Sequence, residues 1–179
     1  MNSKGQEAEL VHQAAFEFVQ QCLEKLPLRT SVVEYGSRFI NGTVRPLFGD
    51  AAYIGLDQLF GDGVDLVEDA CIYEPPQLVD TVVCCGVLEH SEKWPDLIKS
   101  AGRILDPKTG VLILTTVCNP WPAHSVLDGG ALRFGEYYKN MDPLEVTAVL
   151  DVAGFEQHES DLQERTGDFF VLARRQADL

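Results

Sequence analysis

The pattern of apolar and polar positions along the chain predicts a succession of helices and short buried strands. Apolar residues recur at helical spacing over residues 7–26 and again over 91–105, which predicts two amphipathic helices. The uniformly apolar run VLILTTV, at 111–117, is typical of a strand that is buried on both faces. Asp142 and Pro143 are a strong signal for the start of a third helix, which Gly154 ends. The other expected strands are 31–35, 53–57, 64–67 and 80–85.

Strands that alternate with helices predict a parallel sheet that is covered on both faces. The last two strand patterns, FEQHESD and FFVLARR, have no helix between them, so we expect them to form an antiparallel hairpin at one edge. The expected fold class is therefore α/β, a doubly wound Rossmann-like sheet in a three-layer sandwich. The link between the second and third strands is too short for an ordinary parallel crossover, so either its helix is missing or the third strand is vestigial.

The chain has no internal repeat and no linker, and its 179 residues fit a single domain. Within that domain we distinguish three parts. Residues 1–30 hold the N-terminal helix, 31–117 hold the strands expected to bind a ligand, and 118–179 hold a long loop and the final hairpin.

Charge and composition exclude several classes of function. The net charge is −14, so phosphate repulsion opposes a nucleic-acid partner. No apolar run could span a membrane and the N-terminus lacks an apolar signal core, which together predict a cytoplasmic protein with no membrane partner. The five cysteines lack C-x-x-C spacing. A metal or redox site is one interpretation, but small buried side chains in a reducing compartment are favoured, and we expect no metal site.

Candidate ligand-binding residues follow the first three strands. Gly36 allows a ligand to approach the backbone, and Asp57, about twenty residues further on, is typical of an acid that accepts hydrogen bonds from a ribose. To this point a dinucleotide and S-adenosylmethionine fit about equally. Glu34 favours the second, because a carboxylate suits an ammonium or sulfonium group and repels a pyrophosphate. Asp69, beside Ala70, could read an adenine amine, and the final hairpin also favours the second ligand.

Taken in order, the motifs of this chain resemble those of the class I S-adenosylmethionine-dependent methyltransferases, particularly their small single-domain members. The matching stretches are VVEYGS, YIGLD, EDA, VDTVVCCGVLEH, RILDPKTGVLILTTV and AGFEQHE…GDFFVLARR, which cover about residues 31–175. The resemblance implies S-adenosyl-L-methionine as cofactor and strand order 3-2-1-4-5-7-6 with an antiparallel C-terminal strand. The residues assigned to the cofactor are Glu34, Gly36, Ser37, Asp57, Gln58, Asp69, Ala70, Cys85, Gly86 and Leu88.

The opening loop departs from this family, which usually has two further glycines where Arg38 and Ile40 stand. Asn41 and Gly42 are then the residues that can supply the turn. We therefore expect Gly42 to have a positive φ. We also expect Arg38 to point away from the ligand, toward solvent or a nearby acid.

His90 and His124 are the candidate catalytic residues. His90 follows the fourth strand, near the expected position of the methyl group, and an imidazole suits proton transfer near neutrality. His124 lies in the long loop 118–140, whose aromatic residues could contact an acceptor or simply form a packing flap. The predicted function is methyl transfer to a small-molecule acceptor. The alternatives are a methyltransferase-like binding protein without turnover and a nicotinamide-dependent oxidoreductase, which Glu34 and the final hairpin disfavour.

Overall fold

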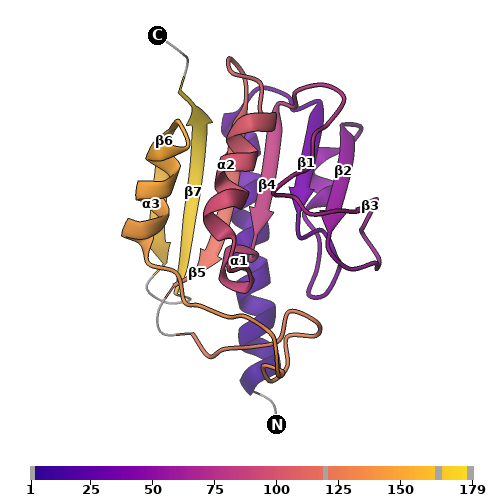
Figure 1. Cartoon of the computed structure of the whole chain (residues 1–179), viewed down its shortest axis with the longest axis vertical. Helices are drawn as coiled ribbons and strands as arrows, with labels where there is room; N and C mark the ends of the chain where they lie inside the picture. The colour runs from indigo at the N-terminus through magenta and orange to yellow at the C-terminus, as the bar shows by residue number, and fades with distance from the viewer. Residues whose placement is uncertain (1–2, 119–120, 164–166, 177–179) are drawn as a thin grey trace.

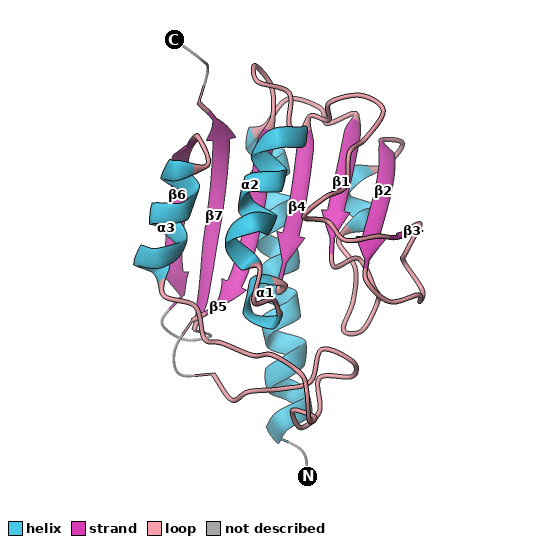
Figure 2. Ribbon diagram, viewed as in Figure 1, coloured by secondary structure: helices cyan, strands magenta, loops and turns pink. Residues whose placement is uncertain are grey.

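A seven-stranded mixed sheet organises the chain (Figures 1 and 2). The computed structural model describes residues 3–118, 121–163 and 167–176. The strand order is β3-β2-β1-β4-β5-β7-β6, as predicted; β7 pairs antiparallel with both β5 and β6, and the other neighbouring strands pair in parallel. The strands are β1 (Ser31–Tyr35), β2 (Ala52–Asp57), β3 (Leu66–Val67), β4 (Thr81–Cys85), β5 (Val111–Val117), β6 (Phe155–Gln163) and β7 (Asp168–Arg175). The helices are α1 (Ser3–Lys25), α2 (Trp94–Ile104) and α3 (Pro143–Val152), with short 3-10 turns η1 (Arg45–Phe48) and η2 (Leu88–His90).

Helices cover both faces of the sheet, which gives the three-layer arrangement (Figure 1). α1 packs on one face, where Phe18 stacks on Phe170 of β7 with ring centroids 4.8 Å apart. α2 and α3 pack on the other face, into a core that includes Ile98 and Leu150. β5 lies between the two cores and is buried at every position, which explains its uniformly apolar sequence.

The edge of the sheet that begins at β3 has little regular structure. β3 has two residues, which pair with Leu56 and Asp57 of β2, and no helix lies between these strands. Both alternatives left open by the sequence therefore hold, because the crossover helix is absent and the strand is vestigial. The link from β1 to β2 likewise contains only η1. The carboxyl ends of β1 and β2 are therefore followed by loops and not by α-helices.

A buried ion pair joins the amino ends of β1, β4 and β5. The guanidinium of Arg29 donates to Thr81 Oγ1 at 2.9 Å, to the carbonyl oxygen of Thr109 at 2.7 Å and to the Asp80 backbone. Asp80 Oδ1 lies 3.3 Å from Arg29 Nε, while its Oδ2 accepts from the backbone N–H of Thr30 at 2.7 Å. These contacts hold together the amino ends of the parallel strands. The carboxyl ends, which were expected to bind a ligand, lie at the opposite end of the sheet.

The five cysteines lie in or beside the two cores of the sheet. All five are free thiols, and Cys22, Cys84 and Cys118 are buried. Cys84 belongs to the core under α2, whereas Cys85 packs against the core under α1, as neighbours in one strand should. Over the described ranges, no helix has the length and apolar character that crossing a bilayer requires.

Candidate functional site

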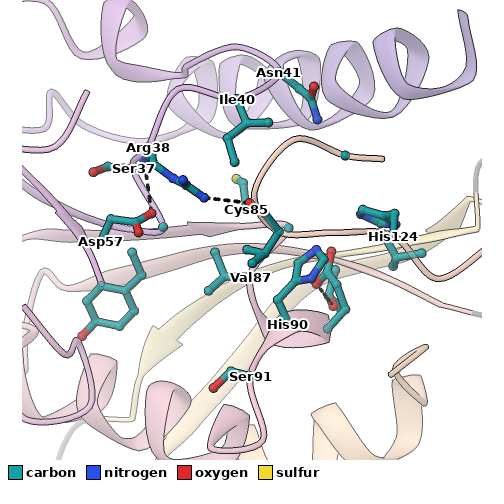
Figure 3. A pocket seen from close by; sticks show the side chains of 18 of the residues that line it. Ser37, Arg38, Ile40, Asn41, Asp57, Cys85, Val87, His90, Ser91 and His124 are labelled. Atoms are coloured by element: carbon teal, nitrogen blue, oxygen red, sulfur yellow. Dashed lines mark hydrogen bonds between the residues drawn. The ribbon is translucent and has the colours of Figure 1, made fainter. Parts of the chain in front are cut away.

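A cavity of about 1240 Å³ opens at the carboxyl ends of the parallel strands. It lies where the strand order reverses between β1 and β4, the usual binding position in such sheets, and residues 121–132 form one of its walls (Figure 3). Both candidate catalytic residues, His90 and His124, line it. So do most of the residues assigned to the cofactor: Glu34, Gly36, Ser37, Asp57, Gln58, Ala70, Cys85 and Gly86.

Two assigned residues lie outside the cavity lining. The carboxylate of Asp69 accepts from the backbone N–H of Cys71 at 2.9 Å and pairs with Lys93 at 3.4 Å, and the hydrogen bond from Cys71 lowers its pKa. Its neighbour Glu68 lines the cavity in its place. Leu88 is 0% exposed and belongs to the core under α2, because η2 turns its side chain inward. Neither Asp69 nor Leu88 is thus brought to the cavity lining, and their contacts with a cofactor stay a prediction.

Position 36 requires glycine for two reasons, its backbone conformation and its packing against Val87. Its φ is 72°, in the left-handed region, and a Cβ at this position would overlap Cγ2 of Val87. The N–H groups of Gly36 and Ser37 both donate to the carbonyl oxygen of Leu56, at 2.9 and 3.0 Å. The loop after β1 thus lies directly against β2 and against Val87, the residue after Gly86.

Asp57 lies at the end of β2 with both carboxylate oxygens near backbone donors. Oδ1 accepts from the N–H of Leu59 at 2.9 Å, and Oδ2 lies 3.4 Å from the N–H of Arg38 (Figure 3). The side chain is half-buried at the cavity wall. These two backbone donors orient the carboxylate at the end of β2, as in a turn.

Two buried carboxylates line the inner part of the cavity. Glu34 is 7% exposed, and burial raises its pKa to about 7. Glu89 is 1% exposed, burial likewise raises its pKa to about 7, and its Oε2 accepts from Thr116 Oγ1 at 2.8 Å. Sequence reasoning missed Glu89, and its position beside His90 at the end of a buried strand was the available signal.

Three aromatic rings gather where residues 121–140, called here the acceptor-side loop, meet η2. The ring centroids of His90 and His124 are 4.9 Å apart, and Tyr138 lies 5.3 Å from His90 and 4.9 Å from His124. Burial, with the neighbouring charge of His124, lowers the pKa of His90 to about 4. The His90 imidazole is therefore neutral near pH 7, and its buried Nδ1 has no hydrogen-bond partner among the described residues.

The opening loop confirms one expectation and corrects another. Gly42 has a φ of 136°, so the Asn-Gly pair does supply the positive φ. Arg38, however, does not point away from the site. Its side chain lines the cavity, and Nη2 donates to the carbonyl oxygen of Val126 at 2.7 Å (Figure 3). The arginine therefore connects the loop after β1 to the acceptor-side loop.

The charges around the cavity are mostly negative. Among the described residues that line the cavity, Arg38 is the one with a Lys or Arg side chain. The carboxylates in the lining are Glu34, Asp57, Glu68, Glu89, Asp128 and Asp168. Across the described ranges, no group of three or more His, Cys, Asp and Glu side chains could hold a metal ion. The lining thus suits a ligand that carries positive charge.

A family model described as a methyltransferase domain matches residues 8–160. The chain belongs to this methyltransferase family. The match extends from α1 into β6 and includes the whole cavity side of the sheet from β1 to β5. The family predicted from the sequence motifs is therefore confirmed.

Solved structures agree with this assignment at the level of the fold. Magnesium protoporphyrin IX methyltransferase from Synechocystis, with bound S-adenosylhomocysteine, superposes with a TM-score of 0.70 at 18% identity, covering 98% of this chain and 88% of that one. The Burkholderia thailandensis 1,6-didemethyltoxoflavin N1-methyltransferase, also with S-adenosylhomocysteine, gives 0.69 at 14% identity over 95% and 80%. A Mesorhizobium loti S-adenosylmethionine-dependent methyltransferase gives 0.68 at 17% over 92% and 100%. No curated protein matches the sequence.

Proposed function

We propose that this methyltransferase-family protein transfers a methyl group from S-adenosylmethionine to a small-molecule acceptor. The observation that carries the proposal is the shared cavity, which has the ribose-type acid Asp57 near one end and the His90–His124 pair near the other. Pockets for a single drug-sized ligand usually measure about 300–1,000 Å³, so about 1240 Å³ leaves room for a cofactor and a small second ligand together.

The residues present fit this cofactor. Asp57 would accept hydrogen bonds from the ribose hydroxyls, and Gly36 and Gly86 would let the ligand approach the backbone of two strand ends. When bound, the cofactor supplies a sulfonium-activated methyl group. The carboxylates Glu34 and Glu89 would stabilise positive charge beside it.

The acceptor would lie beside the two histidines. His90, neutral near pH 7, can hold a polar atom of the acceptor through Nδ1 without adding charge. His124 has its own Nδ1 3.2 Å from the carbonyl oxygen of Pro122, which orients its ring toward His90 and Tyr138. In this arrangement the protein contributes mainly by positioning, with reacting atoms held about 3 Å apart. Glu89 is the group whose raised pKa suits acceptance of an acceptor proton.

The negative lining also bears on the class of acceptor. Phosphate-rich nucleic acid would be repelled by a protein of charge −14 and by the carboxylates at the cavity. A small acceptor, by contrast, can enter between the acceptor-side loop and the strand ends. The aromatic rings of Trp121 and His124 line the cavity and offer it apolar surface.

Calorimetry with S-adenosylmethionine, S-adenosylhomocysteine and NAD in parallel tests the cofactor. We expect micromolar binding of S-adenosylhomocysteine and no preference for NAD, whereas no heat at millimolar ligand would refute the proposal. Release of S-adenosylhomocysteine from S-adenosylmethionine, measured with pools of small amines, phenols and acids, tests turnover. Stimulation by a pool supports a small acceptor, while tight binding without turnover in any pool favours the non-catalytic alternative.

A further inference from the structure

The charge distribution of the cavity leaves one place for an anionic group. Its described lining has six carboxylates and a single Lys or Arg side chain, that of Arg38. An anion elsewhere in the cavity would face these acids in a partly desolvated space, where the ionised ones repel it and none offers a positive charge. Any anionic part of a bound ligand should therefore lie against Arg38.

The side chain of Arg38 is held in position from both ends. Its backbone N–H points at Asp57 Oδ2, 3.4 Å away, and its stem passes over Gly61, where a Cβ would be 2.8 Å from Cγ and Cδ of the arginine. At the far end Nη2 donates to the Val126 carbonyl oxygen. Arg38 thus runs along the cavity, from its backbone N–H beside the candidate ribose-binding acid Asp57 to its guanidinium beside Val126 (Figure 3).

The guanidinium still has donors to offer. Its Nε is shielded from solvent and has no hydrogen-bond partner among the described residues. A guanidinium has five N–H donors in a planar fork that matches a carboxylate, and a shielded donor without a partner carries a cost that a ligand can relieve.

We propose that Arg38 binds the carboxylate of the amino-acid part of the cofactor. This inference rests on the proposed function, because S-adenosylmethionine carries one carboxylate, beside an ammonium and a sulfonium that suit the acids of the cavity. Arg38 stands where a glycine was expected, so here a charged side chain supplies the contact at the loop after β1. Through Nη2 and Val126, the same arginine also holds the acceptor-side loop beside the cofactor's amino-acid end.

Two ligands that differ in the carboxylate test this assignment. S-adenosylhomocysteine and 5′-methylthioadenosine share the adenosine and the thioether sulfur, but the second lacks the amino and carboxylate groups. We would titrate both into the wild type, Arg38→Met and the control Arg174→Met, which changes an exposed arginine on β7. Arg38→Met should weaken S-adenosylhomocysteine binding roughly 10- to 100-fold, the usual loss for a charged hydrogen bond, and change methylthioadenosine binding less than about twofold. Arg174→Met should change neither.

The other outcomes overturn the proposal in distinguishable ways. If Arg38→Met weakens or strengthens both ligands equally, the arginine acts on the adenosine part or occupies ligand space, and it does not hold the carboxylate. If Arg38→Met does not fold, Arg38→Lys takes its place and must still lose affinity for S-adenosylhomocysteine selectively, because a lysine lacks the planar fork. A wild type that binds neither ligand refutes the proposed function itself, and this inference with it.

Discussion

Gly36→Ala is a direct test of how the loop after β1 is held. The residue has a φ of 72°, and a methyl group there would overlap Cγ2 of Val87. A left-handed conformation costs a residue with a Cβ about 1–2 kcal/mol, and overpacking costs about 1–3 kcal/mol. The free energy of unfolding should therefore fall by about 2–5 kcal/mol in the alanine variant.

Val87→Ala separates the two contributions. The shorter side chain removes Cγ2, so in the double variant the overlap disappears while the cost of the positive φ remains. Urea unfolding of the wild type, both single variants and the double variant then forms a double-mutant cycle. We expect the double variant to be more stable than the sum of the single effects predicts, by about 1–3 kcal/mol.

Additivity within about 0.5 kcal/mol would refute this reasoning, because it would mean that Val87 does not lie against Gly36. Binding of S-adenosylhomocysteine to the same four proteins adds a second readout. If the loop after β1 shapes the cofactor site, Gly36→Ala should weaken binding, and Val87→Ala should restore part of the loss.

Three other variants test separate parts of the structure. Asp57→Ala should weaken S-adenosylhomocysteine binding by about 1.5–3 kcal/mol in calorimetry, through loss of charge-assisted hydrogen bonds to the ribose, and unchanged binding would refute the role of Asp57. Burial raises the pKa of Glu89 to about 7, so the folded state holds this proton more tightly than the unfolded state and wild-type stability falls as pH rises from about 4.5 to about 7. Glu89→Gln should consequently gain stability relative to the wild type by up to about 3 kcal/mol between pH 5 and pH 8 in urea unfolding, and a constant difference would contradict the burial of this acid. Arg29→Met should lower the free energy of unfolding by about 3 kcal/mol, because it leaves Asp80 without its buried partner, while ligand affinity at the opposite edge stays unchanged.

Much of the fold could be predicted from local pattern. A run such as 111–117, buried at every position, reads as a central strand because both of its faces must be apolar. Asp142 accepts from the N–H of Leu144 at 2.8 Å, so the predicted start of α3 at Pro143 is correct. These features depend on residues that are close in the chain, so the sequence alone is enough to predict them.

The site was predictable only where it follows strand ends. Gly36, Asp57 and Gly86 line the cavity because parallel strands bring their carboxyl ends to one edge. The vestigial β3 gives no register to decide between Asp69 and Glu68, and of these two Glu68 is the one that lines the cavity. Leu88 lies in the core and not in the cavity lining, because η2 turns its side chain inward, and the sequence pattern did not reveal this rotation.

The sequence by itself determined the family, the order of elements and the strand ends that line the cavity, because hydrophobic period and turn residues act over a few positions. Only the tertiary structure decided the charges and pKa values of the cavity. Glu89 becomes a buried acid because Thr116, 27 residues away, lies beside it, and His90 becomes neutral because His124 and Tyr138 close over it. Arg38 turned inward because Val126, 88 residues further along the chain, offers a carbonyl oxygen across the cavity. Burial and electrostatics depend on such long-range neighbours, which a one-dimensional pattern does not contain.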